Sequence, residues 1–329
     1  MEERARYPDV AAKAGHYESF YIKACEPGGG RGLWIRHTVH KRPGAEPSGS
    51  IWFAYFDRAA AGPRATKVTV PAAELTAPPG SWIRVGDAEI APRAAEGSVD
   101  TEALSAAWSL TFDGDDTPCK YLPADWLYEA PLPRTKFLAP FPNVRFEGRL
   151  EVDDEPVEFS GWPGMIGHNW GTEHAERWIW LEGTGFADSP DTYFDAGAAR
   201  VKLGARTSPW IPSGMLMLDG EPHRLGGLGQ VRSSSIEEHP TACSFVLPGR
   251  DILVRGRACA PAKDFVGWAY ADPRGPEHNT VNCSVADLEL TVERPGLPAR
   301  ELTLSGGAAY ELGMRETDHG IPIQPYPDG

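Results

Sequence analysis

Apolar and polar side chains alternate along most of the chain, in short runs bounded by glycine, proline and aspartate. An alternation of period two is typical of strands with one buried face, and these runs are rich in valine, isoleucine, threonine and aromatic residues. Helical periodicity is confined to residues 8–14 and to a turn or two at 71–75. Strands are therefore predicted at residues 18–25, 32–40, 50–57, 65–70, 104–112, 143–152, 177–182, 192–203, 243–247, 251–259, 265–271, 280–293, 300–304 and 308–315.

The number and shortness of these strands predict an all-β fold of antiparallel barrels or sandwiches, and the lack of blade-like repeats disfavours a propeller. A chain of 329 residues exceeds what one hydrophobic core usually serves, which favours two units. The proline-rich segment 122–142 is the predicted crossing between them. We therefore expect an N-terminal β-barrel domain at residues 1–130 and a C-terminal β-barrel domain at residues 131–329.

Composition narrows the classes of function. The chain has 46 acidic and 32 basic residues, a net charge of −14, which disfavours binding to nucleic acid or to anionic lipid surfaces. No run approaches the length of apolar sequence that a transmembrane helix needs, and the first residues lack the apolar core of a secretion signal. Five scattered cysteines without a CxxC pair predict free thiols in a reducing cytoplasm.

The densest group of polar and aromatic residues lies at 161–180, where glycines predict a tight, irregular backbone. Strand alternation puts Trp178 and Trp180 on one face. A cavity on that face combines an apolar wall with a few polar groups, which is typical of a small-molecule site. The alternative is a structural corner whose tryptophans pack in the core. The candidate residues are His168, Asn169, Trp170, Glu173, His174, Trp178 and Trp180.

Three chemistries can be compared at this cluster. His168, Glu173 and His174 are metal-ligand types, but their spacing matches neither HExxH nor another zinc motif, so no metal is predicted. Acid–base catalysis by Glu173 or His174 is favoured, because aromatic surroundings move the pKa of such groups toward neutrality. A nucleophilic serine or cysteine lacks support, since the chain has no GxSxG motif and the cluster has no cysteine.

A second cluster lies at residues 33–41. Alternation places Trp34 and Arg36 on one face of a strand and His37, among aliphatic residues, on the other. The Arg36 side chain is suited to stack on an aromatic ring or to pair with an acid of the first cluster. His37 is predicted to be a core or barrel-lining side chain rather than a catalyst. The sequence leaves open which face points inward.

Three segments together resemble the calycin-related double-barrel superfamily: the Gly-Leu-Trp-Ile-Arg-His strand at 32–37, the Asn-Trp-Gly turn at 169–171 and the Trp-x-Trp strand at 178–180. That group includes hydroxyneurosporene synthase, tocopherol cyclase, the AttH-like proteins and the lipocalin-like Diels–Alderases. The resemblance implies two lipocalin-like antiparallel β-barrels or half-barrels with an apolar ligand at or between them. It also implies cofactor-free reactions, namely hydration of an alkene, cyclisation or pericyclic ring closure.

We therefore predict a cytoplasmic protein that binds a hydrophobic, isoprenoid or polyketide-like molecule and catalyses its hydration, cyclisation or isomerisation by acid catalysis, without cofactor or metal. The alternatives are a non-catalytic lipid or terpenoid carrier and a structural protein whose tryptophans are all core. No nucleic-acid partner is expected, and no oligomeric state follows from the sequence. The predicted catalytic residues are Glu173, His174 and His168, and the predicted substrate-binding residues are Asn169, Trp170, Trp178, Trp180, Trp34 and Arg36.

Overall fold

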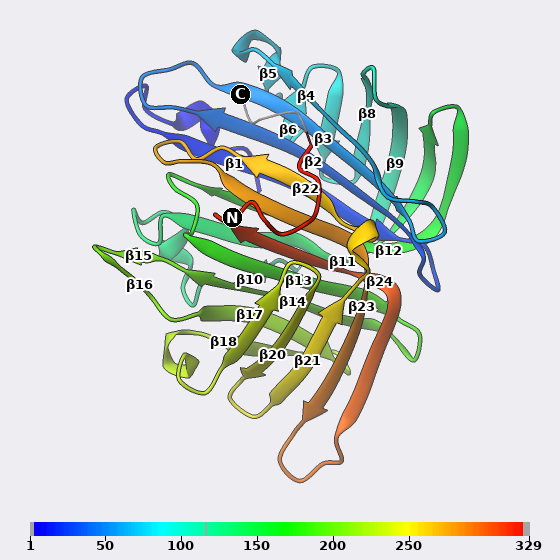
Figure 1. Cartoon of the computed structure of the whole chain (residues 1–329), viewed down its shortest axis with the longest axis vertical. Helices are drawn as coiled ribbons and strands as arrows, with labels where there is room; N and C mark the ends of the chain where they lie inside the picture. Colours follow the sequence, from blue (N-terminus) through cyan, green and yellow to red (C-terminus); the bar gives the residue numbers. More distant parts are fainter. Residues whose placement is uncertain (1–2, 116, 325–329) are drawn as a thin grey trace.

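Two large antiparallel sheets make up the protein in its computed structural model, which describes residues 3–115 and 117–324. In Figure 1 the blue and cyan strands of the first sheet lie above the yellow and orange strands of the second. One sheet curls into a nearly closed barrel and the other into a half-barrel. The predicted all-β architecture is therefore confirmed.

The first sheet has twelve strands in the order β4-β3-β2-β1-β12-β11-β9-β8-β7-β6-β5, with β10 paired to β11. Nearly all neighbours on this path are also neighbours in sequence, as in a meander, and β1 closes onto β12. The strands are β1 (His16–Cys25), β2 (Arg31–Lys41), β3 (Ser48–Asp57), β4 (Arg64–Val70), β5 (Leu75–Thr76), β6 (Ile83–Val85), β7 (Ala88–Ala91), β8 (Ala94–Asp100), β9 (Ser105–Asp115), β10 (Cys119–Lys120), β11 (Thr135–Val152) and β12 (Glu155–Gly171).

The second sheet has ten strands in the order β18-β17-β14-β13-β24-β23-β21-β20-β19, with β22 paired to β23. β15 (Lys202–Leu203) and β16 (Arg206–Thr207) form a separate hairpin. The ten strands are β13 (Arg177–Phe186), β14 (Ser189–Arg200), β17 (Ile211–Leu218), β18 (Glu221–Gly226), β19 (Ser235–His239), β20 (Ala242–Pro248), β21 (Leu253–Cys259), β22 (Val266–Tyr270), β23 (His278–Glu293) and β24 (Arg300–Met314).

Helical structure is limited to short 3-10 turns in the described part of the chain. The helix expected at residues 8–14 is only a 3-10 turn, because Val10 is already extended and ends it. No helix among the described residues has the length and apolar character needed to span a membrane. The turns are η1 (Tyr7–Asp9), η2 (Ala72–Glu74), η3 (Asp125–Tyr128), η4 (Leu228–Gln230) and η5 (Ala262–Asp264).

The chain passes from the first sheet to the second at residues 172–176. The proline-rich segment 122–142, predicted as the crossing, instead leads into β11 of the first sheet. Pro140 and Pro142 are accommodated there by irregularities in the β11–β12 register between Leu138 and Val144. Such bulges are where a strand tolerates residues without an N–H donor. Strands on both sides of the expected boundary at residues 130 and 131 thus belong to one sheet.

The wall formed by β1, β2 and β3 is buried on both faces. Leu33 and Ile35 point into the core of the first sheet. Trp34 and Trp52 point the other way and pack in the core of the second sheet. The alternation predicted for 33–41 is therefore confirmed, and each of its faces serves a different core. The free thiols are also as predicted, since all five cysteines are unpaired and all except Cys259 are buried.

Candidate functional site

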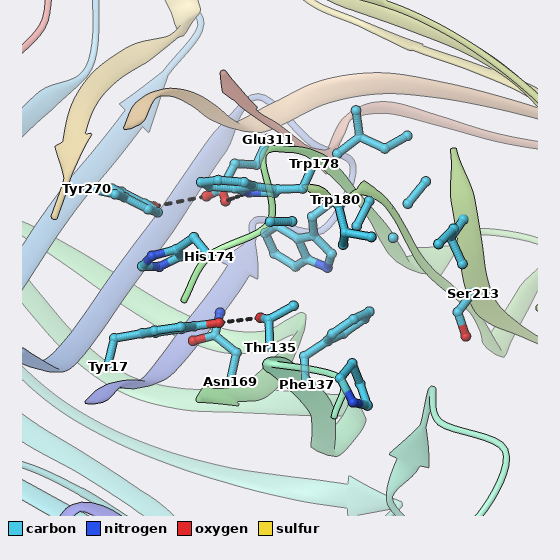
Figure 2. A pocket seen from close by; sticks show the side chains of 18 of the residues that line it. Tyr17, Thr135, Phe137, Asn169, His174, Trp178, Trp180, Ser213, Tyr270 and Glu311 are labelled. Atoms are coloured by element: carbon cyan, nitrogen blue, oxygen red, sulfur yellow. Dashed lines mark hydrogen bonds between the residues drawn. The ribbon is translucent and has the colours of Figure 1, made fainter. Parts of the chain in front are cut away.

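A cavity of about 220 Å³ lies where the double-sided wall of the first sheet meets the second sheet. Figure 2 shows side chains from both sheets turned toward it. Its apolar walls come mainly from aromatic and aliphatic side chains, and its polar groups are few. The lining residues are Tyr17, Tyr21, Trp34, Arg36, Leu122, Pro133, Thr135, Phe137, Asn169, His174, Ala175, Trp178, Ile179, Trp180, Gly197, Ala198, Ala199, Val201, Ile211, Ser213, Tyr270 and Glu311.

Six of the nine residues selected from the sequence line this cavity, and three do not. The alternation of β2 brings Trp34 and Arg36 to it, and the alternation of β13 brings Trp178 and Trp180. The connection between β12 and β13 adds His174. The six are Trp34, Arg36, Asn169, His174, Trp178 and Trp180, and the three outside the lining are His168, Trp170 and Glu173.

The His174 imidazole is held between aromatic rings. It stacks on Tyr17 with ring centroids 3.8 Å apart and planes at 19°, and on Trp178 at 5.6 Å (Figure 2). Its backbone N–H donates to Asp272 Oδ2 at 3.0 Å, which fixes the loop. Neither ring nitrogen has a hydrogen-bond partner among the described residues.

The charge state of His174 follows from this environment. Burial is the main cause that holds the pKa of His174 well below its ordinary value, and electrostatic coupling to His278 and to the Arg36 charge adds to it. The imidazole is therefore neutral near pH 7 and has a nitrogen lone pair. The lone pair can accept a proton from a bound molecule, but the low pKa makes the imidazole a weak base. The shift toward neutrality expected from the sequence, which would suit a proton donor, is therefore wrong for His174, because burial disfavours its charged form.

Arg36 lies at the same cavity with 5% of its surface exposed. Its guanidinium carbon is 4.2 Å from the ring centroid of Tyr270 and 5.4 Å from that of Trp52. These cation–π contacts partly offset the cost of burying the charge. The predicted stacking of Arg36 on Trp34 is a longer contact, at 6.0 Å.

Glu311 on β24 is the one carboxylate among the described residues that line the cavity. It accepts hydrogen bonds from Trp178 Nε1 at 2.9 Å, from the Tyr270 hydroxyl at 3.1 Å and from Asn282 Nδ2 at 3.2 Å. Figure 2 shows two of them. All three donors are neutral, so Glu311 acts as a fixed acceptor that orients the Trp178 indole and the Tyr270 ring.

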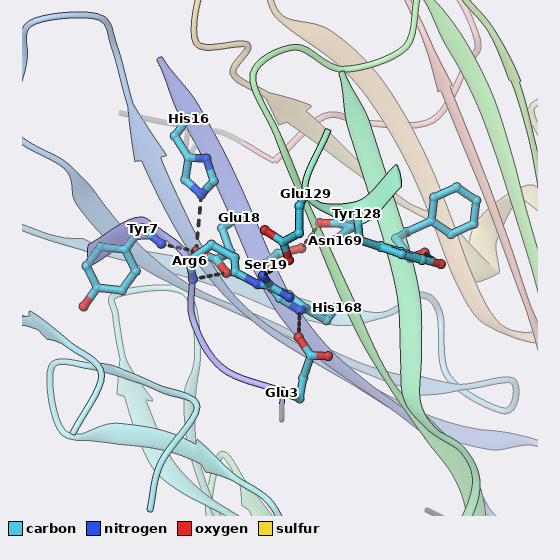
Figure 3. A network of polar contacts seen from close by, with 11 residues as sticks. Glu3, Arg6, Tyr7, His16, Glu18, Ser19, Tyr128, Glu129, His168 and Asn169 are labelled. Atoms are coloured by element: carbon cyan, nitrogen blue, oxygen red, sulfur yellow. Dashed lines mark hydrogen bonds and ion pairs between the residues drawn. The ribbon is translucent and has the colours of Figure 1, made fainter. Parts of the chain in front are cut away.

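Asn169 and His168 are neighbours on β12 and point to opposite sides, as strand alternation requires. The Asn169 amide faces the cavity, and its Oδ1 accepts a hydrogen bond from Ser19 Oγ. His168 points into the first sheet, where Nε2 lies 2.8 Å from Glu18 Oε1 and Nδ1 contacts Glu3. Figure 3 shows the contacts of His168 with Glu18 and Glu3. Trp170 shares the His168 face and stacks on it at 4.5 Å.

The His168 network joins the N-terminal segment to the barrel. Glu18 accepts the backbone N–H groups of Arg6 and Tyr7 at 2.7 and 2.8 Å. Burial opposes ionisation of Glu18, but hydrogen bonds from His16 and His168 outweigh it and lower the pKa of Glu18 to about 2. Burial also opposes a charge on His168, yet the two carboxylates raise its pKa. These hydrogen bonds hold residues 3–7 against strands β1 and β12.

Glu173 lies outside the cavity and its side chain is about one third exposed. Its carboxylate pairs with the Arg134 guanidinium, so the group is neither desolvated nor directed at the apolar wall. The aromatic surroundings that the sequence suggested for it belong instead to His174, its neighbour. The two side chains diverge because they lie on an irregular connection rather than on one strand face.

One group of side chains has the composition of a metal site. Nitrogen and oxygen atoms of His174, Asp272 and His278 lie within 4.8 Å of one another. Within this group, His174 Nδ1 lies 3.9 Å from Asp272 Oδ2. Two imidazoles and a carboxylate form a donor set that suits divalent transition metals. It differs from the set weighed in the sequence, sharing only His174.

Sixteen of the 22 lining residues were not predicted from the sequence, and three of them carry polar groups that matter to the site. Tyr17, Tyr270 and Glu311 come from three strands far apart in the chain, and no local motif joins them. Glu311 does carry a signal, since it is the one charged residue in the otherwise apolar run 306–314. A lone charge inside a buried strand marks a polar group that needs partners.

Comparison with known proteins shows a shared fold at low sequence identity. No protein family model matches the chain. Two uncharacterised proteins of Mycobacterium tuberculosis, from strains CDC 1551 and H37Rv, are 24% identical over 316 residues, covering 95% of this chain and 91% of theirs.

Three solved structures are similar over nearly the whole chain. A protein assigned to AttH from Nitrosomonas europaea has a TM-score of 0.56 at 14% identity, covering 96% of this chain and 98% of that one. Kievitone hydratase from Nectria haematococca has a TM-score of 0.55 at 9% sequence identity, covering 95% of this chain and 96% of that one. The structure of CghA with Sch210972 has a TM-score of 0.55 at 11% sequence identity, covering 92% of this chain and 89% of that one. These similarities confirm the predicted resemblance to the calycin-related double barrels at the level of fold.

Proposed function

We propose that the chain binds a hydrophobic small molecule of isoprenoid or polyketide type in the cavity between its sheets and catalyses its hydration, cyclisation or isomerisation without a cofactor. The observation that carries this proposal is the His174 imidazole, which lies on an aromatic cavity wall and whose ring nitrogens accept or donate no hydrogen bond among the described residues. A cavity that only stores an apolar ligand has no need of such a group. The similarity in fold to a kievitone hydratase and to CghA with its bound compound is consistent with it.

In this proposal His174 transfers the proton. A ring nitrogen accepts a proton from a ligand carbon beside a carbonyl or alkene, while the electrons of the broken C–H bond move into the π system. Return of that proton to another carbon completes an isomerisation. For hydration, His174 takes the proton from water as the water oxygen bonds to carbon, and then returns it to the neighbouring carbon.

The cavity supports these steps in two ways. The faces of Trp178 and Trp180 stabilise positive charge that develops on a polyene during cyclisation. The apolar walls also hold a flexible chain in few conformations and exclude competing water. Of the acid–base pair predicted from the sequence, we assign the role to His174, because the Glu173 carboxylate pairs with Arg134 outside the cavity.

Deuterium exchange tests the proposal without knowledge of the natural product. The protein is incubated in D₂O with a panel of isoprenoid and polyketide alkenes, and the recovered compounds are analysed by mass spectrometry. We expect deuterium in at least one bound compound, its loss in His174→Phe, which keeps a ring stacked on Tyr17, and its retention in Glu173→Gln. Binding without any exchange or product identifies a carrier, and an absence of binding overturns the proposal.

A further inference from the structure

Three aromatic rings surround the guanidinium of Arg36. Rings of Tyr270, Trp52 and Trp34 lie 4.2 to 6.0 Å from its central carbon. Such rings contact the flat faces of a guanidinium, whereas its five N–H groups point outward in the plane. Arg36 Nη1 is buried without a hydrogen-bond partner among the described residues.

No carboxylate of the described chain lies within 4.0 Å of the Arg36 guanidinium. Glu311 lines the same cavity, but its oxygens accept hydrogen bonds from Trp178, Tyr270 and Asn282. The chain has 46 acidic residues and 32 basic ones, so the lack of an ion pair does not come from a shortage of carboxylates. A buried charge that lacks an ion pair destabilises the protein unless another group pairs with it.

We propose that Arg36 binds an acidic oxygen group of the ligand, a carboxylate or the enolate of a 1,3-dicarbonyl, and that the natural ligand is therefore amphipathic. This inference rests on the proposed function, because it takes the cavity as the binding site of a hydrophobic molecule. The apolar part of the ligand lies against Trp178, Trp180 and Phe137. Its oxygen atoms accept hydrogen bonds from Arg36 Nη1, which has no partner among the described residues.

Arg64 shows how an arginine of this chain is satisfied by carboxylates. Arg64 also lies over a tyrosine, with its guanidinium carbon 5.3 Å from the Tyr55 ring centroid. Its N–H groups reach Glu155 at 2.9 Å and Asp153 at 3.7 Å. Arg64 does not line the cavity, so it is a matched control for the loss of one stacked arginine.

The test compares an acid with its own ester. Geranic acid and methyl geranate share one isoprenoid chain and differ in charge, and their binding is measured by calorimetry and by quenching of tryptophan fluorescence. We expect the acid to bind the unmodified protein about tenfold more tightly or better, the effect of one or two hydrogen bonds to a charged group. Arg36→Met removes that preference, and Arg36→Lys keeps part of it.

Each outcome decides a separate point. Equal affinity for acid and ester in the unmodified protein overturns the role of Arg36 and leaves the cavity proposal standing. The same follows when Arg36→Met weakens both ligands alike, or when Arg64→Met abolishes the preference as well. Failure of both ligands and of every other apolar probe to bind overturns the proposed function and this inference with it. The comparison in unmodified protein stands even where a variant does not fold.

Discussion

The indole of Trp178 occupies the space that a side chain at Gly313 would need, because a Cβ on Gly313 would lie 2.2 Å from the ring. The two residues are directly opposite on β13 and β24. Tyr21 and Gly167 repeat the arrangement on β1 and β12, with a Cβ 2.0 Å from the phenol ring. Two cavity rings therefore lie over glycines of the neighbouring strand, and the shape of the cavity depends on residues that do not line it.

The substitution Gly313→Ala tests this dependence. The added methyl group forces Trp178 off its position, and we expect a loss of about 1–3 kcal/mol in the free energy of unfolding, as in other overpacked cores. Binding of an apolar probe should weaken too, because Trp178 also loses its hydrogen bond to Glu311. Urea unfolding and probe titration measure both effects.

Gly229→Ala is the matched control, since nothing lies within 4 Å of a Cβ at Gly229. Stability and probe binding should change little in that variant. An unchanged cavity in Gly313→Ala, with normal binding and normal tryptophan fluorescence, would contradict the dependence on Gly313.

Chelation of metal ions tests the cofactor-free part of the proposed function. Deuterium exchange into a ligand should be unaffected by prolonged dialysis against EDTA, because proton transfer is assigned to His174 itself. His278→Asn should likewise leave the exchange rate within about twofold, the scatter expected for a group that does not touch the ligand. Loss of exchange with EDTA and its recovery with zinc would instead assign His174, Asp272 and His278 to a metal ion.

Lys23 and Glu182 form an ion pair between the sheets, 2.7 Å apart and fully buried. Lys23→Met leaves the Glu182 carboxylate without a counter-charge, and we expect a loss of about 3–5 kcal/mol in the free energy of unfolding. The double variant Lys23→Met, Glu182→Met should recover most of that loss, since it buries no charge. Chemical unfolding of the three proteins decides the matter, and additive losses in the double variant would rule out the coupling.

His37 should make the protein less stable in acid. Burial in the first core lowers the pKa of His37 to about 3, below its value in the unfolded chain. Between about pH 6.5 and 3 the unfolded chain therefore binds a proton that the folded one does not, and stability falls by about 1.4 kcal/mol per pH unit. Above pH 6.5 this contribution is constant.

Urea midpoints at pH 7, 5 and 4 measure the effect. His37→Met should reduce the fall in stability by up to this amount per pH unit, whereas His239→Gln, at an exposed position, should leave it unchanged. Parallel pH profiles for the unmodified protein and His37→Met would show that His37 contributes nothing.

Every strand predicted from sequence alternation overlaps a strand of the structure, because one buried face per strand is a local property. The alternation missed others, among them β12 (Glu155–Gly171), whose glycines instead predicted an irregular backbone. It could not say which face of 33–41 points inward, since both faces of β2 are buried. It also grouped His168 with Asn169 and His174, although adjacent strand residues point to opposite cores. Polar residues that are close in sequence therefore need not meet at one site in the folded protein. Tyr17 and Glu311 converge on the cavity only through strand pairing between distant segments.

The wall of β1, β2 and β3 has a consequence for how the molecule can be divided. A fragment that ends at residue 171 would keep its own core but present Trp34, Trp52 and Phe56 to water. The complementary fragment would lack one side of its apolar interior. A nick within residues 172–176 should accordingly leave two pieces that stay associated, and heating should melt the intact chain in a single transition rather than two.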